Sequence, residues 1–543
     1  MKAFLMYPDR DFDLERALPP NEADLSSDLE LNVLLRAMAG DDKFLFTVAR
    51  HGLHSCLASP VEIVYRQQVL ADCIDQPGVV RELYDVAVAA ITGERHLFGW
   101  TLRDSPESIL YRARQLLQLY VDMFRRLRDI ADAHAAGFRS EGFTRFFAML
   151  TAELTDEYLA EIAAQLGELA FRRGTLISAG LGPGSKGAGY VLRRHPDQGW
   201  RDRVPGLNKS GYTFFVPERD EAGMRALSDL TSRGLNSTAN ALGQSGDHVR
   251  SFFDMLRAEL GFYLGSLNLR DQLTAKGAPV CFPSPAGPDP ASTGGARLSA
   301  RGLYDASLAL SLGAARAAGD PRALGDARAA GAARAVGNDV DADGKQLIMI
   351  TGANQGGKST FLRSVGLACL MMQAGLFVAA ESFAASVSTG VFTHFKREED
   401  ATMEMGKLDE ELDRMSVIAG QLTPGCLLLC NESFASTNER EGSEIARQVI
   451  RALIEAGIRI VVVTHLYDLA ERYYAQHDPA ILFLRAERQP DGHRTFRLPA
   501  GEPLPTSYGQ DLYQHVFGAA DQTRQQPPDL VVSSSKVHND DWR

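Results

Sequence analysis

One stretch near the middle of the chain, QLIMITGANQGGKST (residues 346–360), restricts the possible folds more than any other. An apolar run typical of a buried strand leads into a glycine-rich turn, and an amphipathic helix follows it. Gly352, Gly357, Lys358 and Ser359 fit the pattern G-x-x-x-x-G-K-[ST]. Glycines suit such a loop because its backbone N–H groups must approach phosphate oxygens with no Cβ in the way. The stretch therefore predicts a phosphate-binding loop in an α/β domain.

The residue types in this loop also indicate its ligands. The N-terminus of the following helix carries partial positive charge, which favours an anion. A lysine at position 358 suits the β- and γ-phosphates, and a hydroxyl at Ser359 suits Mg²⁺. We expect ATP and Mg²⁺ as the cofactors of this loop.

A second apolar run, CLLLC (residues 426–430), ends in Asn431 and Glu432. Buried parallel strands carry their functional groups at the carboxyl ends, so both side chains are expected at the edge that holds the phosphate loop. Glu432 is a candidate to orient or deprotonate an attacking water, and also a candidate metal ligand. Asn431 stands where an aspartate is expected. Its amide oxygen can join a metal shell but supplies no negative charge.

A third apolar run, IRIVVVT (residues 458–464), is followed by His465. A histidine at the end of a buried strand is usually only a satisfied polar group. Beside a nucleotide loop it is also a candidate to contact the γ-phosphate or the attacking water, and we predict that catalytic role here. Apolar strands alternating with helical patterns across the second half predict a parallel sheet covered by helices on both faces.

The first half of the chain is predicted to be mainly helical. Ser105 and Pro106 suit a helix start, and one apolar stripe follows over about seven turns; its members are Ile109, Ala113, Leu116, Tyr120, Met123, Leu127 and Ile130. Residues 174–216 interrupt this pattern and predict a small insertion with short strands. Its glycine-rich piece GPGSKG (residues 182–187) also invites a phosphate-loop interpretation, but the spacing and the missing helix favour a hairpin.

Composition changes twice in the second half. A Pro- and Gly-rich segment near residue 276 predicts a boundary between a helical domain (1–275) and an ATPase domain (276–543). Residues 313–344 are low-complexity Ala, Gly, Arg and Asp, which predicts a mobile surface insertion.

Charge and cysteine content limit the possible environments. The net charge of −12, from 57 basic and 69 acidic residues, argues against a surface that binds nucleic acid over its whole extent, but not against a local basic groove. The six cysteines form no C-x-x-C pair, and the N-terminus lacks an apolar secretion signal. Runs of about 18 apolar residues do not occur. We therefore expect a cytoplasmic protein without membrane spans.

The three strand-end elements together resemble the MutS family of mismatch-recognition ATPases. The family loop is T-G-x-N-x-x-G-K-S-T, so Asn354, Gly356 and Thr360 fit in addition to the general loop residues. VVVTHLYDL resembles the family's ATHYHEL, and ASTNEREG (residues 435–442) resembles the turn after its catalytic glutamate, although SFAS replaces the usual GRG-type run. The resemblance implies an ABC-class P-loop ATPase preceded by helical core and lever regions.

The resemblance also implies a dimer. EEDATMEMGKLDEEL resembles the family's signature loop, which crosses to the nucleotide of the neighbouring subunit. Thr402 replaces the usual serine, and Gly406 matches the loop's glycine. Both are candidate nucleotide contacts, and a homodimer with composite ATP sites is expected.

The resemblance further implies that DNA is a partner, in mismatch repair or a related process. About 25 residues precede the first predicted helix, so we expect no family-type domain with a base-stacking wedge, and the 174–216 strands suit a reduced DNA clamp at most. Two alternatives remain open. One is a nucleotide-binding scaffold with little hydrolysis, because Asn431 weakens metal binding. The other is a different ABC-class ATPase that does not act on DNA.

Overall fold

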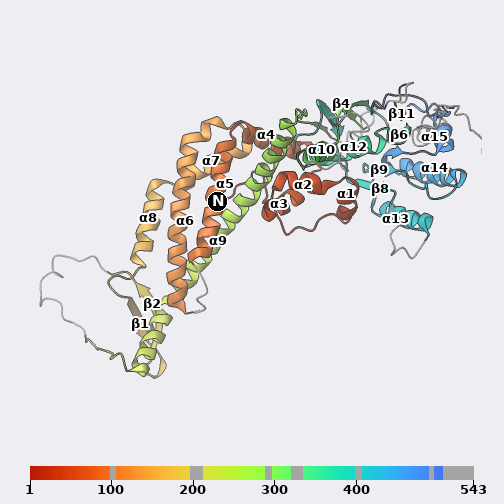
Figure 1. Cartoon of the computed structure of the whole chain (residues 1–543). Helices are drawn as coiled ribbons and strands as arrows, with labels where there is room; N and C mark the ends of the chain where they lie inside the picture. The colour runs from red at the N-terminus through yellow and green to blue at the C-terminus, as the bar shows by residue number, and fades with distance from the viewer. Residues whose placement is uncertain are drawn as a thin grey trace, which may run out of the picture. The chain divides into compact units, whose positions relative to one another are not determined.

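The computed structural model describes residues 1–97, 105–195, 212–287, 296–318, 334–397, 406–487, 489 and 494–504 (Figure 1). The chain divides into two compact units that do not follow the sequence strictly. Unit 1 comprises Met1–Glu22, Leu31–Gly287 and Leu370–Val378, and unit 2 comprises Ala23–Glu30, Pro288–Cys369 and Ala379–Arg543. The predicted boundary at 276 therefore lies before the structural one, because the segment up to Gly287 stays with the helices.

Unit 1 is built from long helices that pack along one another (Figure 1). Its centre is α9 (Glu221–Ala275), a continuous helix of 55 residues that contacts α5 and α6. Tyr120 of the predicted α6 stripe contacts the Phe253 ring at a centroid distance of 5.4 Å. Phe124, which lies outside that stripe, stacks on the same ring at 5.2 Å, whereas the predicted Met123 is only half-buried. The helices of unit 1 before α9 are α2 (Leu31–Ala39), α3 (Lys43–Leu53), α4 (Pro60–Asp75), α5 (Pro77–Leu97), α6 (Pro106–His134), α7 (Glu141–Glu153) and α8 (Asp156–Glu168), with a short 3-10 turn, η1 (Ala135–Gly137).

The predicted insertion of unit 1 contains a hairpin. Strands β1 (Leu176–Leu181) and β2 (Gly187–Arg193) pair antiparallel, and the 3-10 turn η2 (Pro183–Ser185) joins them. Ile177 packs against α9 at Gly234, where a Cβ would lie 2.4 Å from the isoleucine side chain. The short strands predicted across 174–216 do not reach its last described residues, because residues 212–217 have no regular structure and their aromatic side chains are exposed.

Unit 2 contains the predicted parallel sheet, which is confirmed. Within the described residues its five strands run in the order β11-β6-β10-β9-β8, and every pairing is parallel. These strands are β6 (Leu347–Gly352), β8 (Val391–Phe395), β9 (Leu427–Asn431), β10 (Arg459–Val463) and β11 (Ile481–Ala486). In a second, antiparallel sheet, β4 (Leu298–Leu303) pairs with β5 (Asn338–Asp341) and β7 (Ser382–Ser386).

Helices cover both faces of the parallel sheet because alternate residues of each strand point to opposite sides. Leu428 and Cys430 of β9 belong to a core shared with α13 (Lys407–Gln421), α14 (Glu439–Glu455) and α15 (Tyr467–Tyr474). Leu429 points the other way, toward Gly366 of α12 (Lys358–Gln373), where a Cβ would lie 2.6 Å from the leucine. The sheet is thus enclosed on both sides, with its strand ends free to carry chemistry. The remaining elements are α1 (Glu22–Asp28), β3 (Ser284–Ala286) and α10 (Ala306–Ala318).

The predicted low-complexity insertion at 313–344 is too wide. Its first residues complete α10, and its last ones include β5, whose Asn338 and Val340 are buried. Asn338 also donates from Nδ2 to the carbonyl oxygen of Phe496 at 3.0 Å. One apolar residue, a buried asparagine and a few long-range hydrogen bonds are sufficient for this edge strand, whose sequence is Asn-Asp-Val-Asp. Residues 319–333 lie outside the described part of the chain.

Candidate nucleotide site

The strand ends of the parallel sheet bring the predicted site residues to one edge. Strand register aligns Asn431 of β9 with Val463 of β10, Val463 with Ile350 of β6, and Gly352 with Ala486 of β11. Backbone bonds continue this alignment past the strands, since Glu432 N–H donates to Val463 O at 2.8 Å. Residues more than 100 positions apart in sequence therefore share one edge, as the sequence predicted.

The loop after β6 has the backbone that its glycines allow. Gly352, Gln355 and Gly357 have positive φ of 107°, 58° and 89°, a conformation in which successive N–H groups form an anion-binding concavity. A Cβ on Gly352 would lie 2.9 Å from the backbone nitrogen of Ala486, and one on Gly356 would lie 2.7 Å from the Cβ of Ala486. Backbone conformation and steric room both demand glycine at Gly352, and steric room alone demands it at Gly356. The loop therefore fits a phosphate group.

Lys358 is the first residue of α12, and it is buried, with 5% of its surface exposed. Its ammonium donates to the carbonyl oxygens of Gly352 at 2.7 Å and Ala353 at 3.0 Å, across the mouth of the loop. Burial lowers the pKa of Lys358, Glu432 opposes that effect, and Arg494 adds to it. Among the residues that the structure describes, the hydrogen-bond partners of this ammonium are two carbonyl oxygens, so the cation is available to an incoming polyphosphate.

Ser359 and Asn431 are in direct contact. The Ser359 hydroxyl donates to the amide oxygen Oδ1 of Asn431 at 2.8 Å. Asn431 thus occupies the position expected of a second metal-shell residue beside the serine, and its oxygen rather than its nitrogen faces the serine. The pair offers Mg²⁺ two neutral oxygens, so the negative charge at the ion would come from the phosphates.

Glu432 and His465 face each other across the ends of β9 and β10. Glu432 Oε2 lies 4.0 Å from His465 Nδ1, and the side chains are 31% and 38% exposed. This separation is too long for a direct hydrogen bond and leaves both groups open to solvent. The arrangement fits two groups that act on a water molecule near the γ-phosphate.

Four further residues were predicted to contact the nucleotide. Asn354 is exposed at the tip of the loop, and Thr360 lies half-buried in the first turn of α12. Gly406 is exposed and forms the N-cap of α13, whereas Thr402 lies outside the described residues. These four stay predictions of nucleotide contact.

Two residues near the site had escaped sequence reasoning. Arg494, from a segment distant in sequence, donates to the side chain of Gln355 in the loop. His394 of β8 is fully buried beside the turn that carries Glu432. A lone arginine in a polar tail and a lone histidine in an apolar strand give no spacing signal, so the sequence offered no means to find either.

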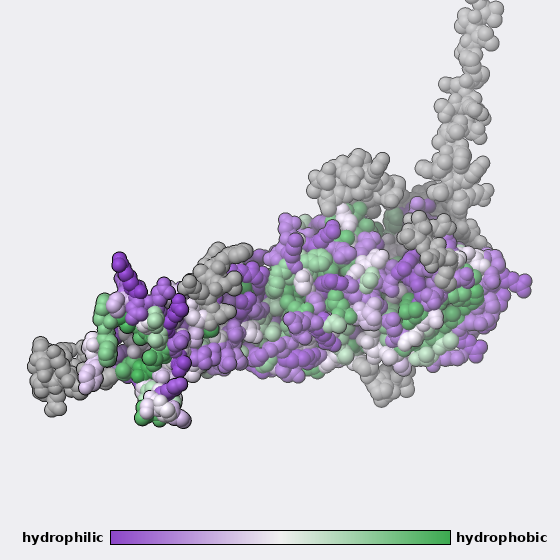
Figure 2. Space-filling view, turned by 90° about the horizontal axis from the view of Figure 1, so that it is seen from below, coloured by the Kyte–Doolittle hydropathy of each residue, from purple (hydrophilic) through white to green (hydrophobic). Residues whose placement is uncertain are grey.

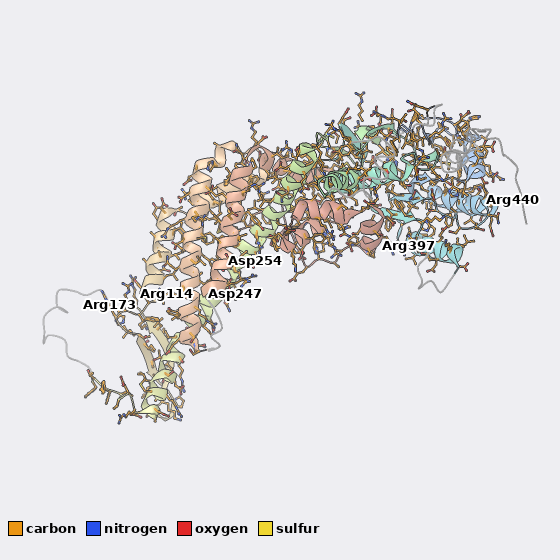
Figure 3. The ribbon with its side chains drawn as sticks, in the orientation of Figure 1. Arg114, Arg173, Asp247, Asp254, Arg397 and Arg440 are labelled. Carbon is orange, nitrogen blue, oxygen red and sulfur yellow. The ribbon has the colours of Figure 1, made fainter. Side chains whose placement is uncertain are left out.

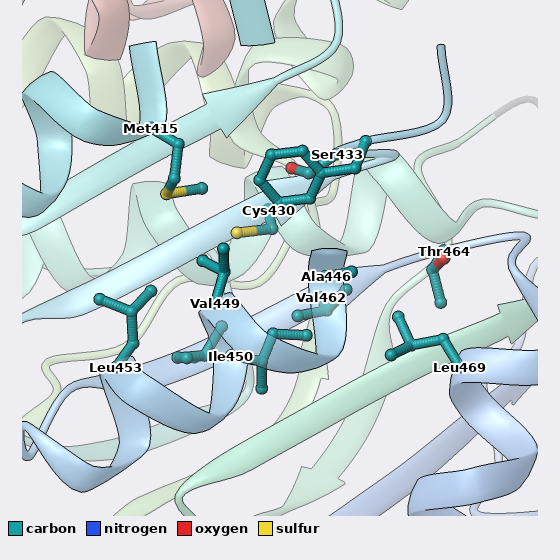
Figure 4. A pocket seen from close by; sticks show the side chains of 12 residues that line it. Met415, Cys430, Ser433, Ala446, Val449, Ile450, Leu453, Val462, Thr464 and Leu469 are labelled. Carbon is teal, nitrogen blue, oxygen red and sulfur yellow. The ribbon is translucent and has the colours of Figure 1, made fainter. Parts of the chain in front are cut away.

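A small cavity lies beside the turn after β9 (Figure 4). Its volume is about 20 Å³, and its lining residues come from β9, β10, α13, α14 and α15. Two lining residues are neighbours of the catalytic candidates in the chain: Ser433 directly follows Glu432, and Thr464 directly precedes His465. The core beside the two catalytic candidates therefore contains a small packing defect.

Unit 1 carries a second candidate surface, the hairpin β1–β2. Residues 169–195 contain five basic residues and no acidic one, in a chain with net charge −12. Both strands are largely exposed, and Figure 2 shows hydrophobic and hydrophilic residues mixed at this end of the molecule. Figure 3 places Arg173 beside the hairpin and Arg114 on the neighbouring helix α6. Arg194 is 76% exposed although it pairs with Glu168. We call residues 169–195 the basic hairpin.

Comparison with known families agrees with both units. Residues 59–276 match the model of the MutS2 N-terminal domain, and residues 348–510 match that of MutS domain V. The chain belongs to the MutS family. The predicted family is thereby confirmed, and the match to domain V covers every strand end of the nucleotide site.

Three relatives of the MutS family are 30–34% identical to this chain over the aligned residues. The DNA mismatch repair protein MutS of Chloroflexus aurantiacus is 30% identical over 183 residues, which cover 31% of this chain and 19% of that protein. The endonuclease MutS2 of Thermus thermophilus is 34% identical over 179 residues, covering 32% and 24%. MutS of Thermotoga sp. strain RQ2 is 34% identical over 135 residues, covering 25% and 17%. The matched region thus spans about a fifth of these relatives. In the described part of this MutS-family chain, helices long and apolar enough for a membrane span are not found.

Proposed function

We propose that this MutS-family chain binds and slowly hydrolyses ATP and couples that cycle to DNA in mismatch repair or a related repair or recombination process. The observation that carries the proposal is the shared strand edge, where the phosphate loop, the Ser359–Asn431 pair and the Glu432–His465 pair meet. Membership in the MutS family supports ATP as the nucleotide and DNA as the partner.

The roles of the side chains follow from their positions. Loop N–H groups and the Lys358 ammonium bind the β- and γ-phosphates. Ser359 and Asn431 would hold Mg²⁺, which neutralises charge on the phosphates when bound. Glu432 orients the attacking water and accepts its proton, and His465 polarises the γ-phosphate or the same water.

Asn431 determines the expected rate. An amide oxygen binds Mg²⁺ more weakly than a carboxylate, because it brings no charge to the ion. Hydrolysis is therefore slow, and a scaffold that binds ATP with little turnover is the second candidate. Steady-state ATPase measurements on wild type and on Glu432→Ala separate the two. Turnover that is equal in both proteins would remove the catalytic assignment.

DNA binding is assigned to the basic hairpin. Its excess of positive charge supports contacts with phosphates, although the chain as a whole is acidic. Binding to homoduplex, mismatched and branched DNA, measured across a salt series with and without ATP, tests this assignment. Failure of every DNA form in every nucleotide state would exclude the repair function.

A homodimer with composite ATP sites completes the proposal. The exposed N-cap of α13 at Gly406 supports it, since the partial positive charge of a helix N-terminus suits the phosphates of a neighbouring nucleotide. Analytical ultracentrifugation with and without a non-hydrolysable ATP analogue tests the assembly. A monomer under both conditions would contradict it.

A further inference from the structure

The turn that carries Glu432 has a backbone that needs outside support. Glu432 has φ of 55° and Phe434 has φ of 61°, both in the left-handed region that favours glycine. Each such residue costs on the order of 1 kcal/mol and persists only where its surroundings hold it. Packing from below is incomplete, because the cavity of about 20 Å³ borders this turn. Hydrogen bonds must therefore supply the missing constraint.

His394 supplies one such constraint. It is fully buried on β8, with Nδ1 2.6 Å from the Ser433 hydroxyl and Nε2 3.1 Å from the backbone oxygen of Glu411 on α13. A carbonyl oxygen only accepts, so Nε2 carries the proton and Nδ1 is an acceptor facing the Ser433 hydroxyl. The same hydroxyl lies 3.0 Å from the backbone oxygen of His394, so both acceptors that Ser433 can use belong to this histidine. Burial, together with the nearby Arg414, lowers the pKa of His394 to about 4, which keeps the ring neutral at physiological pH. The histidine thus bridges α13 and the residue next to Glu432.

A second tie joins the same two elements. The Ser436 hydroxyl donates to Oε1 of Glu411 at 2.6 Å, and Glu411 is buried. The His394 ring also stacks on Phe434, with a centroid distance of 5.6 Å and an interplanar angle of 29°. The turn is therefore held on both sides of Phe434. Before it, Ser433 contacts the His394 ring, which is hydrogen-bonded to the Glu411 backbone; after it, Ser436 bonds the Glu411 side chain directly.

We infer that His394 and Ser433 are positioning residues for the general base: with Glu411 they dock the Glu432 turn onto α13 and fix the carboxylate that orients and deprotonates the water attacking ATP. The inference rests on the proposed hydrolysis of ATP through Glu432. It adds a consequence, because α13 begins directly after Gly406. Any displacement of the start of α13 moves the turn of Glu432 through Glu411 and His394.

Ser433→Ala is the direct test, because it removes the hydroxyl and little volume. We expect kcat to fall by roughly ten- to a hundred-fold, the usual result of a small misplacement of a catalytic group, while KM and ATP affinity stay unchanged. Ser433→Thr keeps the hydroxyl and places its methyl group beside the cavity, so it should restore most of the rate. Unchanged kcat in Ser433→Ala would overturn the inference.

A matched control lies nearby. Ser443 of α14 is also buried, and its hydroxyl has no hydrogen-bond partner among the described residues. Ser443→Ala should leave kcat and KM as in wild type. If Ser433→Ala does not fold, Ser436→Ala cuts the second tie at a half-buried position and should lower kcat in the same direction. A wild-type kcat in Ser436→Ala would then count against the inference.

A double mutant shows whether the pair acts through the general base. In a Glu432→Gln background, Ser433→Ala should cause no further loss of turnover, because the group it positions is already inactive. An equal loss in both backgrounds would mean a general structural role and would overturn the inference. The proposed function fails separately, if Glu432→Gln alone leaves turnover unchanged, and the inference then fails with it.

Discussion

Two glycine-rich stretches of this chain share their residue types and differ in everything else. TGANQGGKST (residues 351–360) and GPGSKG (residues 182–187) each combine glycines, a serine and a lysine. The first joins a buried parallel strand to a helix, whereas the second turns between two exposed antiparallel strands. Lys358 is buried against loop carbonyls, and Lys186 is exposed. Composition therefore does not make a phosphate loop; the elements on either side do.

The glycines also serve different purposes in the two stretches. In the nucleotide loop, a Cβ on Gly356 would contact Ala486, the last residue of β11 and 130 positions away in the sequence. In the hairpin turn, Gly184 has φ of 70°, yet a Cβ there would meet no described atom within 4 Å. Long-range packing fixes the first glycine, and local backbone conformation alone fixes the second.

The largest contrast is expected for the two lysines. Lys358→Ala removes the cation that we propose binds the β- and γ-phosphates, so we expect ATP turnover to fall by about 10²–10³-fold, as for the loss of a transition-state donor. Lys186→Ala should leave turnover without DNA unchanged. Steady-state ATPase assays on both variants make the comparison. Equal turnover of the two variants would break it.

The second contrast concerns DNA and reverses the roles. Replacing Arg172, Arg173, Arg193 and Arg194 with serine should weaken DNA binding by roughly ten- to a hundred-fold and flatten its salt dependence, since phosphate contacts release counterions. ATP turnover without DNA should not change. Arg126→Ser, at an exposed arginine of α6 outside the basic hairpin, is the control. If the salt dependence of DNA binding is the same in the fourfold variant as in wild type, the basic hairpin is not the DNA-binding surface.

A methyl group at each loop glycine gives a smaller contrast. Gly356→Ala forces a Cβ within 2.7 Å of Ala486 Cβ and 2.8 Å of Ala353 O, and overpacking of this kind costs about 1–3 kcal/mol. ATP affinity measured by calorimetry should therefore drop by roughly tenfold. Gly184→Ala meets only backbone strain, of about 1 kcal/mol, and should bind ATP normally. Normal ATP affinity in Gly356→Ala would show that the loop adapts.

The smallest effect is expected within the nucleotide site itself. Asn431→Asp adds a negative charge beside the Ser359 hydroxyl, so turnover should rise a few-fold, and less Mg²⁺ should be needed for half-maximal rate. A magnesium titration of the ATPase rate measures both. If rate and magnesium dependence stay as in wild type, Asn431 does not belong to the metal shell.

Sequence reasoning succeeded in placing the strands of the parallel sheet and the edge at which they end. The runs 347–352, 427–431 and 459–463 are apolar enough to be buried, and parallel strands bring their ends together whatever the order. It could not find His394, because the neighbours that give this residue a role, Ser433 and Glu411, are 39 and 17 positions away in the chain.

Unit assignment was also beyond the sequence. Ala23–Glu30 belongs to unit 2, although the residues before and after it in the sequence belong to unit 1. Leu370–Val378 belongs to unit 1, although its sequence neighbours belong to unit 2. Both segments are short and apolar in part, and only tertiary packing decides which core accepts them. The same holds for β5, whose few buried residues lie in a low-complexity background.

Helix α9 has a mechanical consequence. Its 55 residues form one uninterrupted rod, about 80 Å long at 1.5 Å per residue. If one end is held and the rod tilts as a rigid body by roughly 5°, the other end moves by about 7 Å. The basic hairpin packs on α9 through Ile177 and Gly234, about 60 Å from the Ala275 end, so the same tilt would move this contact by about 5 Å, or about one and a half base-pair steps of a DNA duplex.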